Sequence, residues 1–251
     1  MMMLSVSERI RLLRHAALIQ NDRERKIWLG GLADRPRSIV VSFLNAHAFT
    51  LARKDSAFAN QLFASDFLLR DGVGISILLQ NLGFDPGLNM NGTDLIPEII
   101  RVFKGRNIAL CGTQEPWLSK ASDVVKGMGG NVVLKMDGFQ DHDSYIQALT
   151  QIHPALIIFA MGMPNQEALS IRLARELAQP AVIVNGGAIL DFMAERFSRA
   201  PLFWRQLHLE WFFRLMCEPG RLARRYIMGG ADFLFEVLYL TLVHRYKITA
   251  D

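Results

Sequence analysis

Cysteine is scarce in this chain of 251 residues, and long apolar runs are missing. The two cysteines, Cys111 and Cys217, lie far apart, so we expect reduced thiols in a cytoplasmic protein. The longest apolar candidate, Phe233–Val243, is shorter than the ~20 residues that cross a bilayer, and Glu236 interrupts it. The first residues lack the apolar core of a signal peptide. We therefore expect no membrane-spanning helix.

Several catalytic and metal-binding motifs are also missing. The six histidines are scattered, and neither His-Glu-x-x-His nor Cys-x-x-Cys occurs. There is no Gly-x-Ser-x-Gly nucleophile elbow and no P-loop. Asp141 and Asp143 have a spacing by which some sugar transferases hold a divalent cation. Their position between a turn and a helix start favours an interaction with the helix dipole instead. We expect no metal and no cofactor.

Positive charge is concentrated near the C-terminus. The net charge is +4, yet residues 1–195 carry 19 basic and 19 acidic residues, whereas residues 196–247 carry nine and four. A basic segment rich in aromatic residues is typical of surfaces that meet anionic lipid, nucleic acid or a phosphorylated ligand, although an ordinary solvated helix face has the same composition. No nucleic-acid recognition motif accompanies it, so we expect no nucleic-acid partner.

Strand-like apolar runs alternate with helical patterns through most of the chain. The predicted strands cover residues 38–44, 67–69, 107–111, 131–135, 155–160 and 181–184. This alternation is typical of a doubly wound, mostly parallel Rossmann-like α/β sheet. We expect it to form a catalytic domain over residues 1–196, followed by a basic, aromatic-rich helical appendage over residues 197–251.

The two ends of the chain are less regular. Residues 5–20 have helical spacing and predict a leading helix, whereas the charged, glycine-containing stretch 21–37 predicts a loop or a loop with one helical turn. Residues 202–246 predict helices. We expect these helices to break at Pro219-Gly220 and at Gly229-Gly230, because both residue types disfavour helix interiors.

Polar and glycine residues follow several of the predicted strands. Asn45 follows the strand 38–44, Asp71 the strand 67–69, Gln166 the strand 155–160, and Gly186-Gly187 the strand 181–184. In open parallel sheets, ligands bind at the carboxyl ends of the strands. A carboxylate, two amides and glycine-rich helix starts are suited to a hydroxylated, phosphate-bearing ligand. Turn formation and capping are alternative explanations for Asn45, Asp71 and Gln166, and tight packing explains Gly186-Gly187 equally well.

Arginines and aromatic residues gather in the C-terminal segment. Arg214, Arg221 and Arg224 lie around the Pro219-Gly220 break, and the arginine fork suits a diphosphate. The aromatic residues are suited either to a bilayer interface or to packing against the α/β domain; they are Trp204, Trp211, Phe212 and Phe213.

A series of short motifs resembles the WecG/TagA/CpsF glycosyltransferase family. The resemblance covers about residues 38–228, and it is specific because the motifs agree in order and spacing. The motifs are Asn45, Asp71-Gly72-Val73-Gly74, Gly92-Thr93-Asp94-Leu95, Met161-Gly162-Met163-Pro164-Asn165-Gln166-Glu167, Gly186-Gly187-Ala188, Arg199-Ala200-Pro201 and Leu209-Glu210-Trp211 with Glu218-Pro219-Gly220-Arg221-Leu222.

The resemblance implies an inverting, metal-independent glycosyltransferase. Such an enzyme moves a sugar from a UDP-sugar to a polyprenyl-diphosphate-linked sugar at the cytoplasmic face of the membrane. It implies that Asp71 is the catalytic base and that Asn45 and Gln166 line the pocket. It further implies that the appendage closes over the site and directs Arg214, Arg221 and Arg224 to the diphosphates.

Two positions depart from the family pattern. Relatives usually have Thr two residues before the pocket Asn, where this chain has Phe43. Relatives often have Arg three residues before the Gly-x-Asp-Leu motif, where this chain has Asn89. We count Asn89 among the substrate-binding candidates. The lost cation suggests a donor other than N-acetylmannosamine, such as glucose in a gum-type exopolysaccharide pathway.

Two other hypotheses compete with glycosyl transfer. A Rossmann-type oxidoreductase fits the predicted fold, but the chain lacks Gly-x-Gly-x-x-Gly after its first strand. A non-catalytic membrane-associated scaffold fits the basic C-terminal segment. The sequence does not give the donor sugar, the acceptor sugar, the linkage or the oligomeric state, and it leaves a homo-oligomer open.

Overall fold

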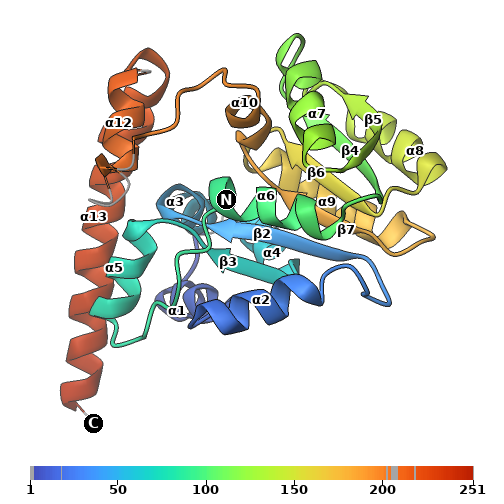
Figure 1. The fold of residues 1–251 in the computed structure, drawn as a ribbon. Helices are drawn as coiled ribbons and strands as arrows, with labels where there is room; N and C mark the ends of the chain where they lie inside the picture. The colour runs from blue at the N-terminus through green and yellow to red at the C-terminus, as the bar shows by residue number, and fades with distance from the viewer. Residues whose placement is uncertain (1–2, 18, 202, 205–208, 218, 251) are drawn as a thin grey trace.

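The chain folds around one parallel β-sheet (Figure 1). This computed structural model describes residues 3–17, 19–201, 203–204, 209–217 and 219–250. Within them, seven strands pair in the order β1-β3-β2-β7-β6-β4-β5, and every pairing is parallel. The strands are β1 (Ala16–Ala17), β2 (Ile39–Leu44), β3 (Phe67–Arg70), β4 (Asn107–Gly112), β5 (Asn131–Met136), β6 (Leu156–Ala160) and β7 (Val182–Asn185).

Helices cover both faces of the sheet, which confirms the predicted doubly wound α/β fold. One face carries α2 (Asp22–Gly30), α6 (Gly92–Val102), α7 (Trp117–Gly127) and α10 (Ile189–Met193). The other face carries α1 (Val6–His15), α3 (Ala46–Lys54), α4 (Ser56–Ala64), α5 (Val73–Asn81), α8 (His142–Ile152) and α9 (Asn165–Glu176).

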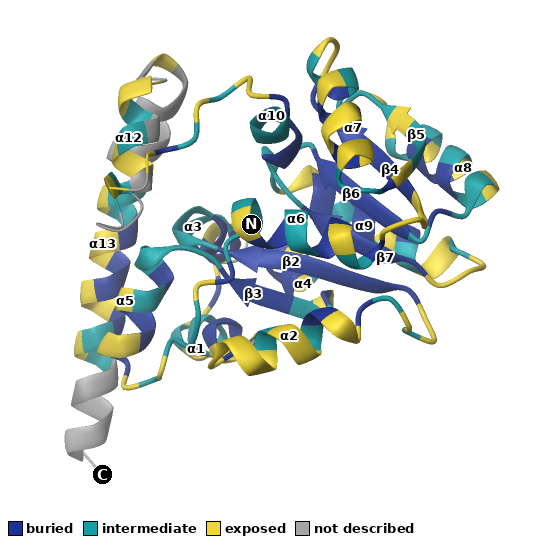
Figure 2. Cartoon of the chain, in the orientation of Figure 1, coloured by how far each residue is buried: buried dark blue, intermediate teal, exposed yellow. Residues whose placement is uncertain are grey.

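Side chains of the central strands alternate between two apolar layers. In β2, Val41 and Phe43 point to the layer under α2 and α6, whereas Val40 and Leu44 point to the opposite layers. All six residues of β2 are buried, as expected for a parallel strand covered on both faces (Figure 2). Because side chains alternate between the two layers with a period of two, burial of both faces fixes the position of each strand in the sheet. The residues that follow each strand therefore have fixed positions as well.

The N-terminal segment differs from the expectation in two respects. The leading helix ends at His15, and the next two residues form β1, which pairs with β3 at the edge of the sheet. Residues 22–30, expected to be mainly loop, form α2. Asn21 caps this helix by accepting from the Glu24 N–H, and Leu29 is buried against the sheet. Tertiary burial and a cap therefore outweigh the weak apolar pattern of this stretch.

The C-terminal segment forms α12 (Glu210–Cys217) and the long helix α13 (Pro219–Ala250). The expected break at Pro219-Gly220 separates the two helices, but Gly229-Gly230 does not interrupt α13, so that expectation is wrong. Phe233, Val237 and Leu240 anchor α13 in the apolar layer shared with α3 and α5 (Figure 1). In the part of the chain that the structure describes, no helix combines the length and apolarity needed to cross a membrane.

Candidate functional site at the carboxyl ends of the strands

Asn45 and Asp71 meet at the ends of two neighbouring strands. Leu44 and Arg70 are register partners in β2 and β3, so the residues that follow them lie side by side. Asn45 Nδ2 donates to Asp71 Oδ2 at 3.3 Å. The other end of the Asn45 amide caps α3, because Oδ1 accepts from the Ala48 N–H at 3.0 Å. The predicted candidate base and pocket amide are therefore in contact, and both are partly exposed.

Arg70 fixes the loop that borders Asp71. Its side chain is 4% exposed and donates to three backbone carbonyls, those of Pro86, Gly87 and Gly72, at 2.7, 2.9 and 3.2 Å. Burial lowers the pKa of Arg70 from its ordinary value, while the Asp71 carboxylate acts in the opposite direction. The loop is thus held by a buried cation one residue before the candidate base, a role that the sequence did not reveal.

Asn89 lies on this loop, beside the Asp71 turn. Its Oδ1 accepts from the Gly72 N–H at 2.8 Å. Gly72 has φ +85°, a conformation that L side chains rarely adopt, which explains the glycine after Asp71. Asn89 is exposed, and the contact places it within the same group as Asn45 and Asp71. Phe43, the other departure, is buried under Gly92 and belongs to the core.

Gln166 joins the turns that follow β6 and β7. Its Oε1 accepts from the N–H groups of Gly162 and Gly187, at 3.2 and 3.1 Å. The side chain is fully buried. Gly186 has a different reason to be glycine, because a Cβ there would meet the Ile189 side chain at 2.5 Å. The second group of predicted residues is therefore also brought together, at the same edge of the sheet as the first (Figure 1).

Glu167, the residue after Gln166, carries a fully buried carboxyl group. Its Oε1 accepts from Gln166 Nε2 at 2.8 Å, and among the residues that the structure describes its Oε2 has no hydrogen-bond partner. Burial raises the pKa of Glu167 to about 7, while the hydrogen bond from Gln166 lowers it. Glu167 is not among the site residues predicted from the sequence. A Glu in the first turn of a helix ordinarily faces solvent, so only tertiary structure reveals its burial.

This buried carboxyl group predicts a pH-dependent stability difference. The folded-state pKa lies above the ordinary value of 4.5, so the folded protein binds the extra proton between these values and loses stability as pH rises through about 4.5–7. Glu167→Gln removes that loss. We expect the unfolding free energy of the variant, relative to that of wild type, to rise by roughly 3 kcal/mol between pH 4 and pH 8. Urea unfolding across this range measures it, and a pH-independent difference would contradict the assignment.

A third polar group lies at the end of β4. Thr113 Oγ1 donates to Asp191 Oδ1 at 2.5 Å, and Arg196 Nη1 donates to the same oxygen at 3.1 Å. Thr113 has φ +50°, an uncommon conformation for this residue type. Sequence reasoning missed this group. Its signal was Gly112-Thr113 directly after a predicted strand, the same position that identified Asn45 and Asp71.

The C-terminal helix reaches the Asp71 turn. A Cβ on Gly74 would meet the Phe233 ring at 3.1 Å and the Ala46 Cβ at 3.2 Å, so this glycine permits the close approach of α13. Phe233 also packs edge-on against Phe49, with ring centroids 6.3 Å apart. The second glycine of the Asp71 motif therefore serves the packing of α3, α5 and α13 around the candidate base.

Ion pairs hold α13 against α1 and α3. Glu236 is 2% exposed and pairs with Arg9 at 2.5 Å and with Arg53 at 3.4 Å. Arg53 also pairs with Asp232, which Lys54 contacts from the other side at 2.6 Å. The acidic residues that interrupt the apolar pattern of α13 are thus the ones that attach it to the α/β domain.

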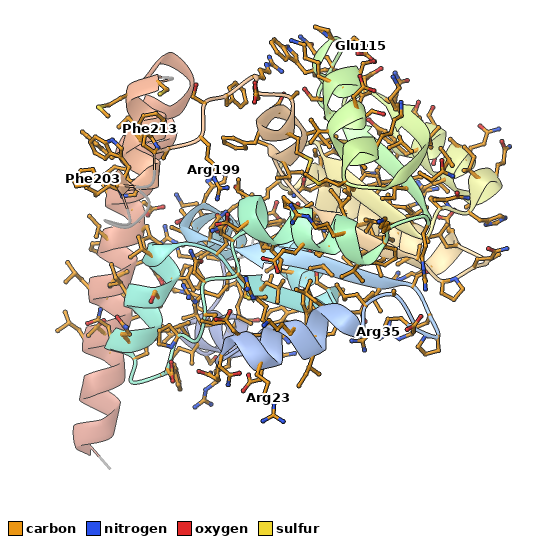
Figure 3. The ribbon with its side chains drawn as sticks, viewed as in Figure 1. Arg23, Arg35, Glu115, Arg199, Phe203 and Phe213 are labelled. Carbon is orange, nitrogen blue, oxygen red and sulfur yellow. The ribbon has the colours of Figure 1, made fainter. Side chains whose placement is uncertain are left out.

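The predicted diphosphate-binding arginines belong to the same helices. Arg214 lies in α12, and Arg221 and Arg224 lie in α13. Their side chains lie outside the described part of the structure, so their role stays a prediction. Arg199, on the segment that connects α10 with α12, forms an ion pair with Asp94 of α6 (Figure 3). Two of the family-like motifs therefore meet in space.

The acidic residues around His142 have structural partners. Asp141 caps α8 by accepting from the Ser144 N–H, and this hydrogen bond lowers its pKa. Asp143 pairs with Arg172. Within the described ranges, no three His, Cys, Asp or Glu side chains are grouped as a metal ion would require.

The parallel sheet with helices on both faces and polar residues at its carboxyl edge defines an α/β protein of the Rossmann-like class. A model of the WecG/TagA/CpsF glycosyltransferase family matches residues 25–247. The chain belongs to this family and is a glycosyltransferase, which confirms the resemblance seen in the motifs. The family assignment does not favour the oxidoreductase or scaffold hypotheses.

Two curated relatives give the comparison more detail. The chain is 28% identical over 205 residues to an N-acetylglucosaminyldiphosphoundecaprenol N-acetyl-β-D-mannosaminyltransferase of Bacillus subtilis, covering 76% of each chain. It is 27% identical over 178 residues to a protein of the same name from Bacillus spizizenii, covering 69% of each chain.

Proposed function

We propose that this protein is an inverting, metal-independent transferase that moves a sugar from a UDP-sugar to a polyprenyl-diphosphate-linked sugar. The observation that carries the proposal is the Asp71 carboxylate at the end of β3, held by Asn45. A carboxylate in this position is suited to accept a proton from a hydroxyl group bound at the edge of the sheet.

The proposed reaction is a single displacement. The acceptor hydroxyl oxygen forms a bond to the anomeric carbon, the bond from that carbon to the UDP oxygen breaks, and Asp71 takes the hydroxyl proton. The leaving diphosphate gains stabilisation from the N-terminus of α9 near the Gly162 turn and from Arg214, Arg221 and Arg224. Asn45 orients the base, and Gln166 shapes the glycine turns.

The acceptor proposal rests on the relatives. Their names specify an N-acetylglucosaminyl-diphosphoundecaprenol acceptor and the transfer of N-acetylmannosamine. We propose an acceptor of the same chemical class for this chain. The donor sugar is a separate matter, because Asn89 stands where relatives often have Arg and its side chain binds the Gly72 N–H. We therefore propose a donor other than UDP-N-acetylmannosamine, such as UDP-glucose.

A panel of UDP-sugars tests this proposal. Each donor is incubated with a lipid-diphosphate-sugar acceptor, with and without EDTA, and the mass of the product is measured by mass spectrometry. We expect an acceptor larger by one glycosyl residue with one preferred donor, formed equally well in EDTA. Loss of product in EDTA would refute metal independence, and no product with any donor would refute the proposed reaction.

We also propose that the protein binds the cytoplasmic membrane surface peripherally through α12 and α13. On α13, the face opposite the packed one carries exposed apolar side chains (Figure 2); they are Leu234, Phe235, Leu238, Tyr239 and Leu242. Phe203 is exposed near α12 (Figure 3), and Trp211 is exposed within α12. Together with the basic composition, such a face suits an anionic lipid surface.

The division of the chain into two domains and the formation of a homo-oligomer stay predictions.

Replacing Leu238 and Leu242 by Ser tests this membrane proposal. Because each buried Leu contributes about 1.5–3 kcal/mol, we expect co-sedimentation with phosphatidylglycerol vesicles to weaken at least ~10-fold. Ile27→Ser on α2 is the matched control, since Ile27 is 66% exposed and α2 lies away from α13. Equal vesicle binding by the double variant and wild type would rule out this face.

A further inference from the structure

One amide oxygen couples the turns after two different strands. Gln166 Oε1 accepts from both Gly162 and Gly187, and each glycine has a positive φ, +85° and +62°. The Gln166 N–H in turn donates to the Gly162 carbonyl at 3.2 Å. The shapes of these two turns therefore depend on one side-chain amide keeping its oxygen directed toward them.

An amide side chain can rotate by half a turn and exchange its oxygen and nitrogen. In that orientation the Gln166 NH₂ group would face two N–H donors, and its oxygen would face the Glu167 carboxyl group. Both side chains are fully buried, so bulk water does not supply the hydrogen bonds that this orientation would lose. The 2.8 Å hydrogen bond from Gln166 Nε2 to Glu167 Oε1 selects the orientation that serves the glycines.

A buried polar chain holds this part of α9 against the sheet. Ser170 Oγ donates to the Glu167 carbonyl at 3.0 Å and accepts from Asn185 Nδ2 at 3.0 Å. Asn185 Nδ2 also donates to Ser42 Oγ of β2 at 2.9 Å. The backbone of α9 at Glu167 is therefore anchored to β7 and β2 through Ser170 and Asn185.

We infer that Glu167 is a positioning residue, whose carboxyl group orients the Gln166 amide and thereby holds the Gly162 and Gly187 turns in the shape that binds the donor diphosphate. The nature of that ligand rests on the proposed function, whereas the coupling of the two turns does not. The inference can therefore be tested both without and with substrate.

Amide hydrogen exchange provides the substrate-free test. In Glu167→Leu, we expect the Gly162 and Gly187 amides to exchange at least ~10-fold faster than in wild type, because their acceptor is no longer held. In Glu167→Gln, the new side-chain oxygen still accepts from Gln166 Nε2, so both amides should stay within about threefold of wild type. Unchanged exchange in Glu167→Leu, or equal loss in both variants, would overturn the inference.

An exchange of the two side chains tests the geometry directly and covers the case in which Glu167→Leu does not fold. Gln166→Glu alone places two carboxyl groups together, and we expect faster exchange at both glycines and at least ~10-fold lower kcat/KM. In the double variant Q166E/E167Q, a carboxylate accepts from both glycines and from the new amide. We expect it to recover most of the exchange protection and much of the kcat/KM lost in Gln166→Glu.

The outcomes separate this inference from the proposed function. If the double variant exchanges as fast as Gln166→Glu, the positioning role is wrong. If exchange recovers but kcat/KM does not, Gln166 contacts the substrate itself and positioning does not account for the activity. If the wild type transfers no sugar with any UDP-sugar donor, the reaction is wrong, and the exchange rates at Gly162 and Gly187 still decide the positioning role.

Discussion

The Asp71→Asn variant is expected to fold and to bind UDP like the wild type, but to transfer sugar at least ~100-fold more slowly. Asparagine has the same shape, so its Oδ1 can still accept from Asn45 Nδ2 and its backbone N–H can still donate to the Leu44 carbonyl. What the variant loses is the carboxylate that we propose takes the acceptor proton. Turnover with the preferred donor measures the loss, and calorimetry measures UDP affinity.

A matched control separates this loss from a general effect of charge removal. Asp123→Asn makes the same change on α7, where the carboxylate is 76% exposed and pairs with Lys126 in the same helix. We expect this variant to keep wild-type turnover. Near-normal turnover in Asp71→Asn would remove Asp71 from the role of base.

The Glu236→Ala variant is expected to lose about 3 kcal/mol or more of unfolding free energy. The substitution removes the 2% exposed carboxylate that pairs with Arg9, and it removes one of the two carboxylates that pair with Arg53, since Asp232 remains. A largely buried charge that loses its partner is costly. Because Phe233 and Val237 lie on the same face, α13 should also loosen from α3 and α5. Urea unfolding and hydrogen exchange along α13 measure both effects.

An exposed ion pair supplies the comparison for Glu236. Asp143→Ala removes one of the two carboxylates that pair with Arg172, the other being Glu176, at a site where the Asp143 carboxylate is 81% exposed. Such exposed pairs contribute less than about 1 kcal/mol. Equal losses in the two variants would mean that burial of Glu236 contributes nothing.

The packing of α13 also makes truncation after residue 196 a poor test of the C-terminal arginines, because truncation uncovers the apolar layer under α13. Alanine variants of Arg214, Arg221 and Arg224 are the better test.

The sequence predicted the sheet well because its signals are local. Buried parallel strands appear as short apolar runs, and the residues after them lie at one edge of the sheet. Asn45 and Asp71 were named as candidates on this ground, and the structure shows that their side chains are in contact. The same reasoning did not predict helix α2 or strand β1. The helix depends on burial of Leu29, and a two-residue strand has no periodicity.

Long-range contacts account for the part of the site that could not be predicted. Gln166 was expected in the pocket, but its burial and its bonds to Gly162 and Gly187 depend on the folded sheet. In the sequence, Glu236 interrupts an apolar run and shows no other signal. Its partner Arg53 lies 183 residues earlier, so the attachment of α13 has no local signal.

The configuration at the anomeric carbon of the product tests the account most directly. Single displacement with Asp71 as base requires that the bond to the acceptor forms on the face opposite the departing UDP. Nuclear magnetic resonance of the purified product, through the one-bond carbon–proton coupling at that carbon, should show a configuration inverted relative to the donor. A retained configuration would contradict single displacement and the role assigned to Asp71.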